Sequence, residues 1–245
     1  MSVGFGPFDL KRRFVPGSVL TFSAIGLFSF SATPAFSIPV ERSVQEFHDD
    51  EGHLTEVHSV RGSKLEGWSR RFYPDGRVLE EVVMRSGKPF GRYRYYDLEG
   101  KLSIRGRYRA GELDGEYTKY YSSGGVSDRW VYRAGVAVGE GRKFYESGAI
   151  RETSPYRRGK VNGWVKSYDP NGLLKAEMTY VDGLAEGTGK FYKDNGKLGI
   201  IKNYKNDKID GWVFFFDDEG KLIERQYFED GRRVDNGNLP LTDAR

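Results

Sequence analysis

The sequence predicts an all-β fold, an elongated array of about eight stacked 24-residue β-hairpins in one antiparallel meander sheet. Glycine returns at three fixed positions of a 24-residue unit, and an aromatic side chain returns at two others, without an insertion or a deletion. Self-similarity at a fixed period of 20–50 residues indicates a repeat architecture, in which each unit packs only on its neighbours. The 32 glycines, 15% aromatic residues and low hydrophobic fraction of 38% suit many short strands joined by glycine turns.

Three rows of glycine define the unit. The first row is Gly67, Gly91, Gly115, Gly139, Gly163, Gly187 and Gly211. The second row is Gly76, Gly100, Gly124, Gly148, Gly172, Gly196 and Gly220. The third row is Gly87, Gly111, Gly135, Gly159, Gly183 and Gly231, with Asp207 once in its place. Aspartate enters the left-handed backbone region more readily than most side chains, so Asp207 is compatible with a turn there.

Aromatic and aliphatic rows keep the same phase. The first aromatic row is Phe72, Tyr96, Tyr120, Phe144, Tyr168, Tyr192 and Phe216, and its aliphatic companion is Val78, Leu102, Val126, Ile150, Leu174, Leu198 and Leu222. The second aromatic row is Tyr108, Tyr132, Tyr156, Tyr180, Tyr204 and Phe228, with Met84 in the first unit. Side chains alternate along a strand, so 68, 70 and 72 are expected on one face and 69, 71 and 73 on the other. We therefore expect the first aromatic row and its companion to stack into ladders that form the core.

Each unit is interpreted as two strands and two turns. In the unit that begins at Gly163, the first strand is expected at about 164–168 and the second at about 173–180. The Asp-Pro-Asn-Gly turn at 169–172 joins them, because its last residue favours positive φ. About sixteen strands at about 4.8 Å spacing predict a surface on the order of 75 Å long.

The amino terminus, residues 1–37, is predicted to be a signal peptide. A Lys-Arg-Arg segment at 11–13 precedes an apolar run at 19–30, and small residues precede a cleavage site before Ile38. The apolar run is shorter than the roughly 20 residues of a membrane span. We therefore expect an exported chain, either periplasmic or at the cell surface or secreted.

The remainder is predicted to be one repeat domain at 38–235, followed by a polar C-terminal tail at 236–245. Residues 38–66 are interpreted as a diverged N-terminal cap unit. A terminal repeat lacks one neighbour, so its outer face is expected to differ from the others.

The composition excludes several classes of site. There is no cysteine, so disulfides, thiolate metal sites and cysteine nucleophiles are excluded. The formal charge is +4, but beyond residues 1–37 Lys and Arg are interspersed with Asp and Glu in every repeat and form no block of one sign. Nucleic-acid binding requires basic charge gathered on one face, so we expect no nucleic-acid partner.

The recurring pattern resembles a known family. Gly-Trp-x-x-x-Tyr, then Asn-Gly-x-Leu, then Tyr-x-Asp-Gly-x-x-x-Gly is similar to the MORN repeat, in the variant of bacterial YwqK-like proteins, which are often described as antitoxins. The resemblance covers about residues 43–235. It implies a twisted sheet of successive hairpins that serves as a scaffold for protein partners, and some MORN arrays are proposed to bind phospholipid head groups.

No catalytic, metal or cofactor site is predicted. The sequence lacks a nucleophile elbow, a P-loop and HExxH, and Gly139-x-Gly141 has no third glycine in phase for a dinucleotide fingerprint. His48, His53 and His58 lie among carboxylates, and imidazoles and carboxylates together are the usual ligands of zinc, but an exposed cap hairpin explains the same residues. We expect a non-enzyme.

The best local candidate for a binding surface is an apolar C-terminal stretch. Trp212, Phe214 and Phe215 make both strand faces apolar, whereas the matching stretch of the first unit alternates with polar residues. Phe191 and Phe215 occupy a position that holds Arg or Lys in several other units, and Tyr95 shares it. Exposed apolar patches usually mark interaction surfaces, so these five residues are predicted to bind an unidentified protein partner. Packing of this end on its own tail or on a dimer mate is the alternative.

Further alternatives follow from the same rows. A row of basic residues in one phase is the candidate for binding lipid head groups: Arg70, Arg94, Arg142, Lys166 and Lys190. Cell-wall glycan binding would use exposed Trp and Tyr, and an antitoxin role would follow from the family resemblance. A homodimer could form through an edge strand or through the C-terminal patch. The predicted function is a non-catalytic, exported scaffold for protein–protein interaction.

Overall fold

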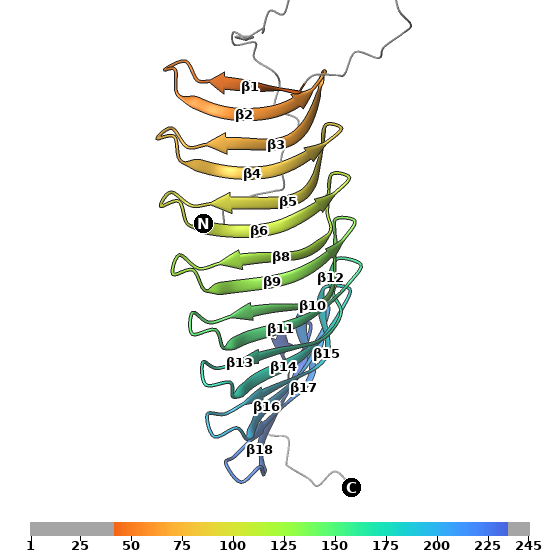
Figure 1. Cartoon of the computed structure of the whole chain (residues 1–245). Helices are drawn as coiled ribbons and strands as arrows, with labels where there is room; N and C mark the ends of the chain where they lie inside the picture. The colour runs from red at the N-terminus through yellow and green to blue at the C-terminus, as the bar shows by residue number, and fades with distance from the viewer. Residues whose placement is uncertain (1–41, 235–245) are drawn as a thin grey trace, which may run out of the picture.

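The computed structural model describes residues 42–234, which form one open antiparallel sheet of 19 strands (Figure 1). Successive strands pair in chain order, as a meander requires, apart from two short strands that share their partner with the strand after them. The predicted all-β hairpin array is confirmed. The predicted signal peptide at 1–37 and the predicted tail at 236–245 both lie outside the described residues. The described residues include no helix long and apolar enough to cross a lipid bilayer.

The strands group into eight hairpins. They are β1 (Arg42–His48) with β2 (Leu54–Arg61), β3 (Lys64–Phe72) with β4 (Val78–Arg85), β5 (Lys88–Tyr96) with β6 (Leu102–Arg109), β7 (Glu112–Leu113) and β8 (Gly115–Tyr120) with β9 (Val126–Arg133), β10 (Val136–Phe144) with β11 (Ile150–Arg157), β12 (Lys160–Val161) and β13 (Gly163–Tyr168) with β14 (Leu174–Val181), β15 (Leu184–Tyr192) with β16 (Leu198–Lys205), and β17 (Lys208–Phe216) with β18 (Leu222–Glu229). The short β19 (Arg232–Arg233) follows. β7 with β8, and β12 with β13, are each one strand interrupted at a single residue.

Two kinds of turn alternate along the chain. The longer turn lies within each hairpin: Tyr73 N–H donates to the Arg77 carbonyl at 2.8 Å, and Gly76 N–H donates to the Tyr73 carbonyl at 2.9 Å. The tight turn joins one hairpin to the next and has two central residues, both with positive φ in seven of these turns. That geometry matches the right-handed twist of the flanking strands. Asp207 adopts φ 67° in such a turn, as the sequence predicted.

The first glycine of each unit was misplaced by the sequence prediction. The strand begins directly after the tight turn, so β5 spans nine residues and Gly91 lies inside it rather than before it. Gly91 has φ 91° and faces Tyr108, while the three residues 90–92 lie opposite Val83 alone in the preceding strand. This is a β-bulge, and glycine supplies its left-handed backbone without strain.

The two faces of the sheet differ in chemistry. We call one the tyrosine face; it carries Ser69, Val82 and Met84 and, in later hairpins, Tyr93, Tyr108, Tyr117, Trp130, Tyr132, Tyr156, Tyr180 and Tyr204. We call the other the ion-pair face; it carries Trp68, Arg70 and Glu81 and their counterparts. The core lies on the tyrosine face, where Val82, Met84 and Tyr108 form one buried cluster.

The ladder predicted as the core is only half-buried. Each member of the first aromatic row does lie opposite its aliphatic companion, as in the pairs of Phe72 with Val78 and Tyr192 with Leu198. Both rows nevertheless keep partial exposure, and Ile150 is 37% exposed. A single sheet has no second layer to cover the side that carries these two rows, so they stay partly exposed where the sequence predicted a core.

Burial on the tyrosine face changes the acidity of its phenols. Desolvation raises the pKa of Tyr108 and of Tyr117 to about 12, and it raises the pKa of Tyr93 further. These phenols therefore remain neutral at physiological pH and pack as apolar rings. Tyr93 and Tyr108 meet edge to face, with ring centroids 5.5 Å apart.

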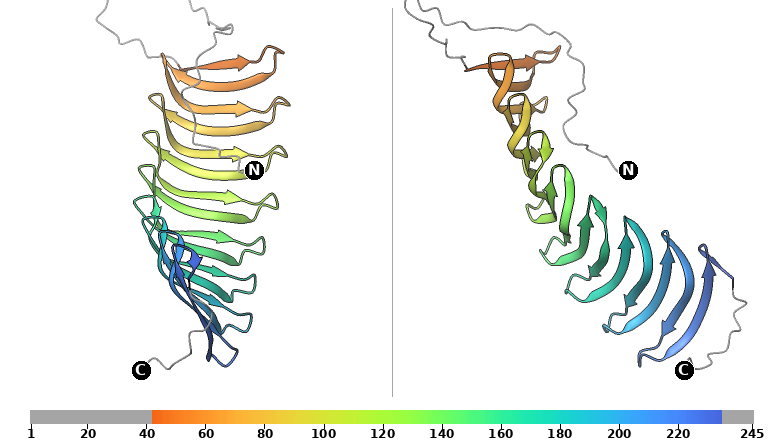
Figure 2. Two further views of the ribbon diagram at one scale, coloured as in Figure 1. Left: turned by 180° about the vertical axis from the view of Figure 1, so that it is seen from behind. Right: turned by 90° about the vertical axis from the view of Figure 1, so that its right-hand side faces the viewer.

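The array twists along its length. The first hairpins stack with their strands almost parallel to one another, and the later ones rotate progressively, so the C-terminal hairpins present a curved profile (Figure 2). Tyrosine hydroxyls link one hairpin to the next on the longer turns. Tyr73 donates to the Tyr96 carbonyl at 2.9 Å, and Tyr145 donates to the Tyr168 carbonyl at 2.7 Å.

Steric fit on the tyrosine face gives a first prediction. A Cβ added at Gly141 would lie 2.6 Å from Trp130 Cδ1 and 2.8 Å from Tyr156 Cε2, both ring atoms of packed side chains. We expect Gly141→Ala to lower the free energy of unfolding by about 1–3 kcal/mol, because overpacking forces those rings to move. Denaturant titration followed by circular dichroism measures the change.

The matched control is Gly125→Ala. Gly125 also lacks positive φ, and its added Cβ would meet nothing closer than 3.6 Å. Equal unfolding midpoints for the two variants would contradict the steric explanation.

Candidate functional site

An apolar hollow lies at the C-terminal end of the array, where two of the predicted binding residues meet. Phe191 of β15 pairs with Ile200 of β16, which pairs with Phe215 of β17. These three side chains share the tyrosine face. Together with Phe216 and Ile223 they line a hollow of about 270 Å³.

Gly199 also lines the hollow. This residue is the unpaired one in the bulge between β15 and β16, because Phe191 pairs with Ile200 and Tyr192 with Leu198. The same position in other units holds a side chain: Leu79, Ser103, Ser127, Arg151, Lys175 and Ile223. In the seventh hairpin a Cβ added at Gly199 would lie 3.0 Å from Lys193 Cγ, so the glycine lets the aliphatic part of Lys193 pack against the strand at the side of the hollow.

The remaining predicted binding residues lie elsewhere. Trp212 and Phe214 are on the ion-pair face, where Trp212 packs edge to face on Tyr227 at 5.0 Å between centroids. Tyr95 belongs to β5, four hairpins away from Phe191. The structure thus brings Phe191 and Phe215 together and separates the other three from them.

The predicted lipid-binding row is neutralised by carboxylates. Glu81, with only 12% of its side chain exposed, lies between Arg70 at 2.8 Å and Arg94 at 3.6 Å. Arg142 pairs with Glu140 at 2.8 Å. The row is therefore a set of ion pairs along the sheet and does not form a bare basic stripe.

Glu177 holds the other two members of the row. Lys190 Nζ lies 3.2 Å and Lys166 Nζ 3.8 Å from its carboxylate, which is 15% exposed. The Tyr192 hydroxyl donates to the same group at 2.9 Å. Desolvation raises the pKa of Glu177, but the hydrogen bonds from Tyr192 and Lys190 and the two positive charges outweigh it and hold the pKa below its usual range.

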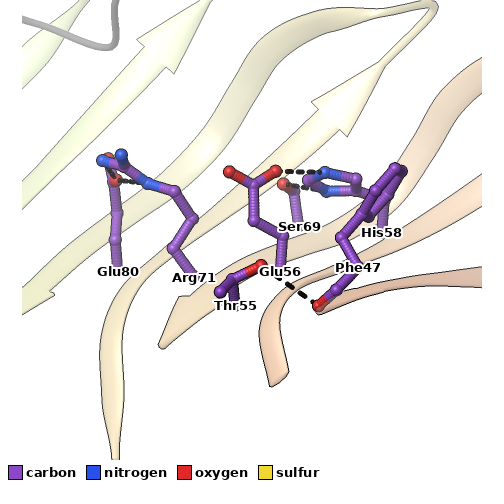
Figure 3. Close-up of polar contacts among 7 residues, drawn as sticks. All are labelled: Phe47, Thr55, Glu56, His58, Ser69, Arg71 and Glu80. Atoms are coloured by element: carbon purple, nitrogen blue, oxygen red, sulfur yellow. Dashed lines mark hydrogen bonds and ion pairs between the residues drawn. The ribbon is translucent and has the colours of Figure 1, made fainter. Parts of the chain in front are cut away.

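A buried polar network at the N-terminal end escaped the sequence prediction (Figure 3). His58 Nδ1 lies 2.7 Å from Ser69 Oγ, and its Nε2 lies 2.8 Å from Glu56 Oε2. The hydrogen bond to His58 lowers the pKa of Glu56. Next to them, Arg71 Nε donates to the buried Glu80 at 2.7 Å. Strand register joins these residues, and only the register could have indicated the network.

The order of serine, imidazole and carboxylate also occurs in nucleophilic catalysis, but here the serine is closed off. Ser69 is 2% exposed, and Phe47 packs against the His58 ring at 5.2 Å between centroids. A substrate could not reach the hydroxyl, so the network serves to satisfy buried polar groups. Across residues 42–234 the structure gathers no three His, Asp or Glu side chains that could hold a metal ion.

Comparison with protein families identifies the two hairpins beside the hollow. The model of the MORN repeat variant matches residues 162–182 and 185–206. These two segments are similar to the MORN repeat variant. The second matched segment contains Phe191, Gly199 and Ile200, so the hollow is built partly on a recognised MORN repeat variant. Such repeats are generally binding or scaffold modules, which fits a non-catalytic role. No curated protein matches the chain.

The Glu177 cluster gives a second prediction. Glu177→Gln removes a carboxylate that two lysines and a tyrosine face, and we expect a loss of about 1–3 kcal/mol in unfolding free energy at pH 7. Because the folded-state pKa is depressed, this contribution is present above the ordinary value of 4.5 and is lost as the pH falls through the lower folded value. The two proteins should therefore converge in stability below pH 4.5.

Urea unfolding of both proteins at pH 7 and in acid tests this expectation. Glu140→Gln is the control, since the Glu140 carboxylate is 49% exposed. A Glu177→Gln variant as stable as Glu140→Gln at pH 7 would show that the cluster is not stabilising.

Proposed function

We propose that this protein is a non-catalytic scaffold that binds a protein partner at the apolar hollow of its C-terminal hairpins. The observation that carries the proposal is the hollow lined by Phe191, Ile200 and Phe215. Hot spots of protein interfaces are commonly apolar anchors that enter such recesses. At the same strand position in other units the side chain is often charged, as in Arg71, Lys119 and Lys143, so Phe191 and Phe215 make this part of the array suited to an apolar anchor.

Two further features support this location. Lys202 Nζ lies 5.0 Å from the centroid of the Phe191 ring and adds a cation beside the hollow. The recognised MORN repeat variant at 162–206 reaches into it, and such repeats are generally binding modules. A partner segment with an apolar side chain next to a carboxylate fits both groups.

Capture of a partner tests the site. A crosslinking pull-down from native cells should recover a protein with the wild type and lose it with a Phe191→Ser, Phe215→Ser double variant. The control is a Val131→Ser, Val181→Ser variant, which removes two exposed apolar side chains at 41% and 51% exposure from other hairpins. Circular dichroism and a melting curve establish that each variant folds.

Each result has a defined meaning. Capture that survives in the Val131, Val181 variant and fails in the Phe191, Phe215 variant supports the hollow as the docking site. Equal capture by all three proteins would contradict it. Sedimentation with anionic vesicles, in place of protein capture, would favour the lipid alternative, and specific recovery of a toxin would favour the antitoxin alternative suggested by the family resemblance.

We also propose that the scaffold is exported and acts in the periplasm, at the cell surface or after secretion. Support comes from the basic, apolar and small-residue order of residues 1–37. Amino-terminal sequencing of the protein recovered from an exporting host should find Ile38 as the first residue. Recovery of the intact chain from the cytoplasm would contradict export.

A further inference from the structure

The alternation of two turn types gives the array two different long edges. All longer turns lie along one edge and all tight turns along the other (Figure 1). We call the first the long-turn edge, made of residues 49–53, 73–77, 97–101, 121–125, 145–149, 169–173, 193–197 and 217–221. We call the second the tight-turn edge, made of residues 61–64, 85–88, 109–112, 133–136, 157–160, 181–184, 205–208 and 229–232.

The tight-turn edge is basic. Its twelve cationic residues are Arg61, Lys64, Arg85, Lys88, Arg109, Arg133, Arg157, Arg158, Lys160, Lys205, Lys208 and Arg232, and its five anionic residues are Glu112, Asp182, Asp207, Glu229 and Asp230. The imbalance is greatest in the first five turns, where nine cationic residues stand against Glu112 alone.

The long-turn edge has the opposite sign. Its twelve anionic residues are Asp49, Asp50, Glu51, Asp75, Asp97, Glu99, Glu146, Asp169, Asp194, Asp217, Asp218 and Glu219, and its five cationic residues are Arg77, Lys101, Lys193, Lys197 and Lys221. The two edges thus mirror each other in formal charge. Along the chain the basic tight turns alternate with the acidic longer turns, so the sequence does not show that the two charges lie on opposite edges.

The cations of the first five tight turns are exposed and mostly lack partners. Among the described residues, Arg109 is the one member of this group that lies within 4 Å of a carboxylate, at 3.4 Å from Asp114. Arg85 stacks instead over the Phe90 ring at 4.6 Å. This contrasts with the ion-pair face, where Arg70 and Arg94 share Glu81. An external anion would therefore meet guanidinium groups that are free to bind it.

We propose that the tight-turn edge of one copy binds the long-turn edge of a second copy, so that the arrays associate side by side. Both edges are built by the same 24-residue unit and advance by two strands per unit, about 9.6 Å at the usual strand spacing. Opposite charges on neighbouring copies can therefore face each other along the first hairpins, which stack with their strands almost parallel (Figure 2). Guanidinium groups also suit paired hydrogen bonds to carboxylates. The equal period is the reason to favour a second copy over another polyanion.

The contact would join two different surfaces, so it does not close on itself. Each bound copy keeps one basic or one acidic edge free, and a third copy can add there. The expected product is a ribbon that grows with protein concentration. Because the contact is between exposed charges, salt should dissolve it. The hollow at Phe191 and Phe215 is not involved, so this association is independent of the proposed partner binding.

Sedimentation velocity of the purified full chain provides the test. At about 0.01 M salt, where charges act over about 30 Å, the mean mass should at least double as the concentration rises. At about 1 M salt, where they act over about 3 Å, it should return to that of the monomer. A wild type that stays monomeric at low salt at every concentration overturns the proposal, whatever the variants do.

A charge-swap experiment identifies the two edges. One variant reverses the tight-turn edge with Arg61→Glu, Arg85→Glu, Arg133→Glu and Arg157→Glu. The other reverses the long-turn edge with Asp50→Lys, Glu51→Lys, Glu99→Lys and Glu219→Lys. Each variant alone carries edges of like sign and should stay monomeric at low salt, while an equal mixture should associate.

Two outcomes contradict the pairing. A mixture that stays monomeric although both variants fold by circular dichroism excludes contact between these edges. Binding of a monomeric wild type to anionic vesicles or to duplex DNA at low salt would assign the tight-turn edge to that polyanion and not to a second copy.

Discussion

The backbone hydrogen bonds between successive strands are the interaction on which the whole array depends. Each internal hairpin is held by the one before and the one after, and no second layer of helices or strands covers either face of residues 42–234. Burial is correspondingly thin: the buried cluster of Val82, Met84 and Tyr108 spans only neighbouring hairpins. Stability in such an array comes from nearest-neighbour contacts that are repeated, and not from a single central core.

Close packing on the tyrosine face makes this thin core sufficient. Large rings require small neighbours, and the chain provides glycine in strand positions without positive φ, at Gly106, Gly141 and Gly189. The rings of Tyr117, Trp130 and Tyr204 lie over these positions. The ion-pair face is stabilised by charge, since Glu81 and Glu177 each lie between two cations. Each face is therefore completed by side chains of its own hairpin and the next.

Most of the fold could be predicted from the sequence, because its cause is local and periodic. The 24-residue period predicts the turns that Gly76 and its counterparts close. Asp207 fits the turn that glycine occupies in other units. The glycines at 67 and 91 were misread for a physical reason: positive φ serves a bulge inside a strand as well as a turn, and composition does not distinguish them. The contact of His58 with Ser69 depends on strand register, which no single segment specifies.

The candidate site could be predicted only in part. The common phase of Phe191 and Phe215 indicated correctly that they lie together, since two residues in the same phase of adjacent units share a face. Trp212 and Phe214 follow the opposite alternation and could have been separated from them on the same rule. Gly199, which lines the hollow, is visible in the sequence as the exception in its row, but its contact with Lys193 is not. The separation of charge between the edges was missed because it appears only when alternate turns are assigned to opposite sides.

The separation of charge between the two edges determines the dipole moment of the molecule. In a compact protein, charges on different elements point in many directions and their moments largely cancel. Here each hairpin places its longer turn on one side and its tight turn on the other, and the twist rotates successive hairpins only gradually (Figure 2). The moments of the first five hairpins therefore add across the width of the array, and these hairpins make the protein a transverse dipole. Such a molecule would align in an electric field or beside a charged boundary before it touches anything.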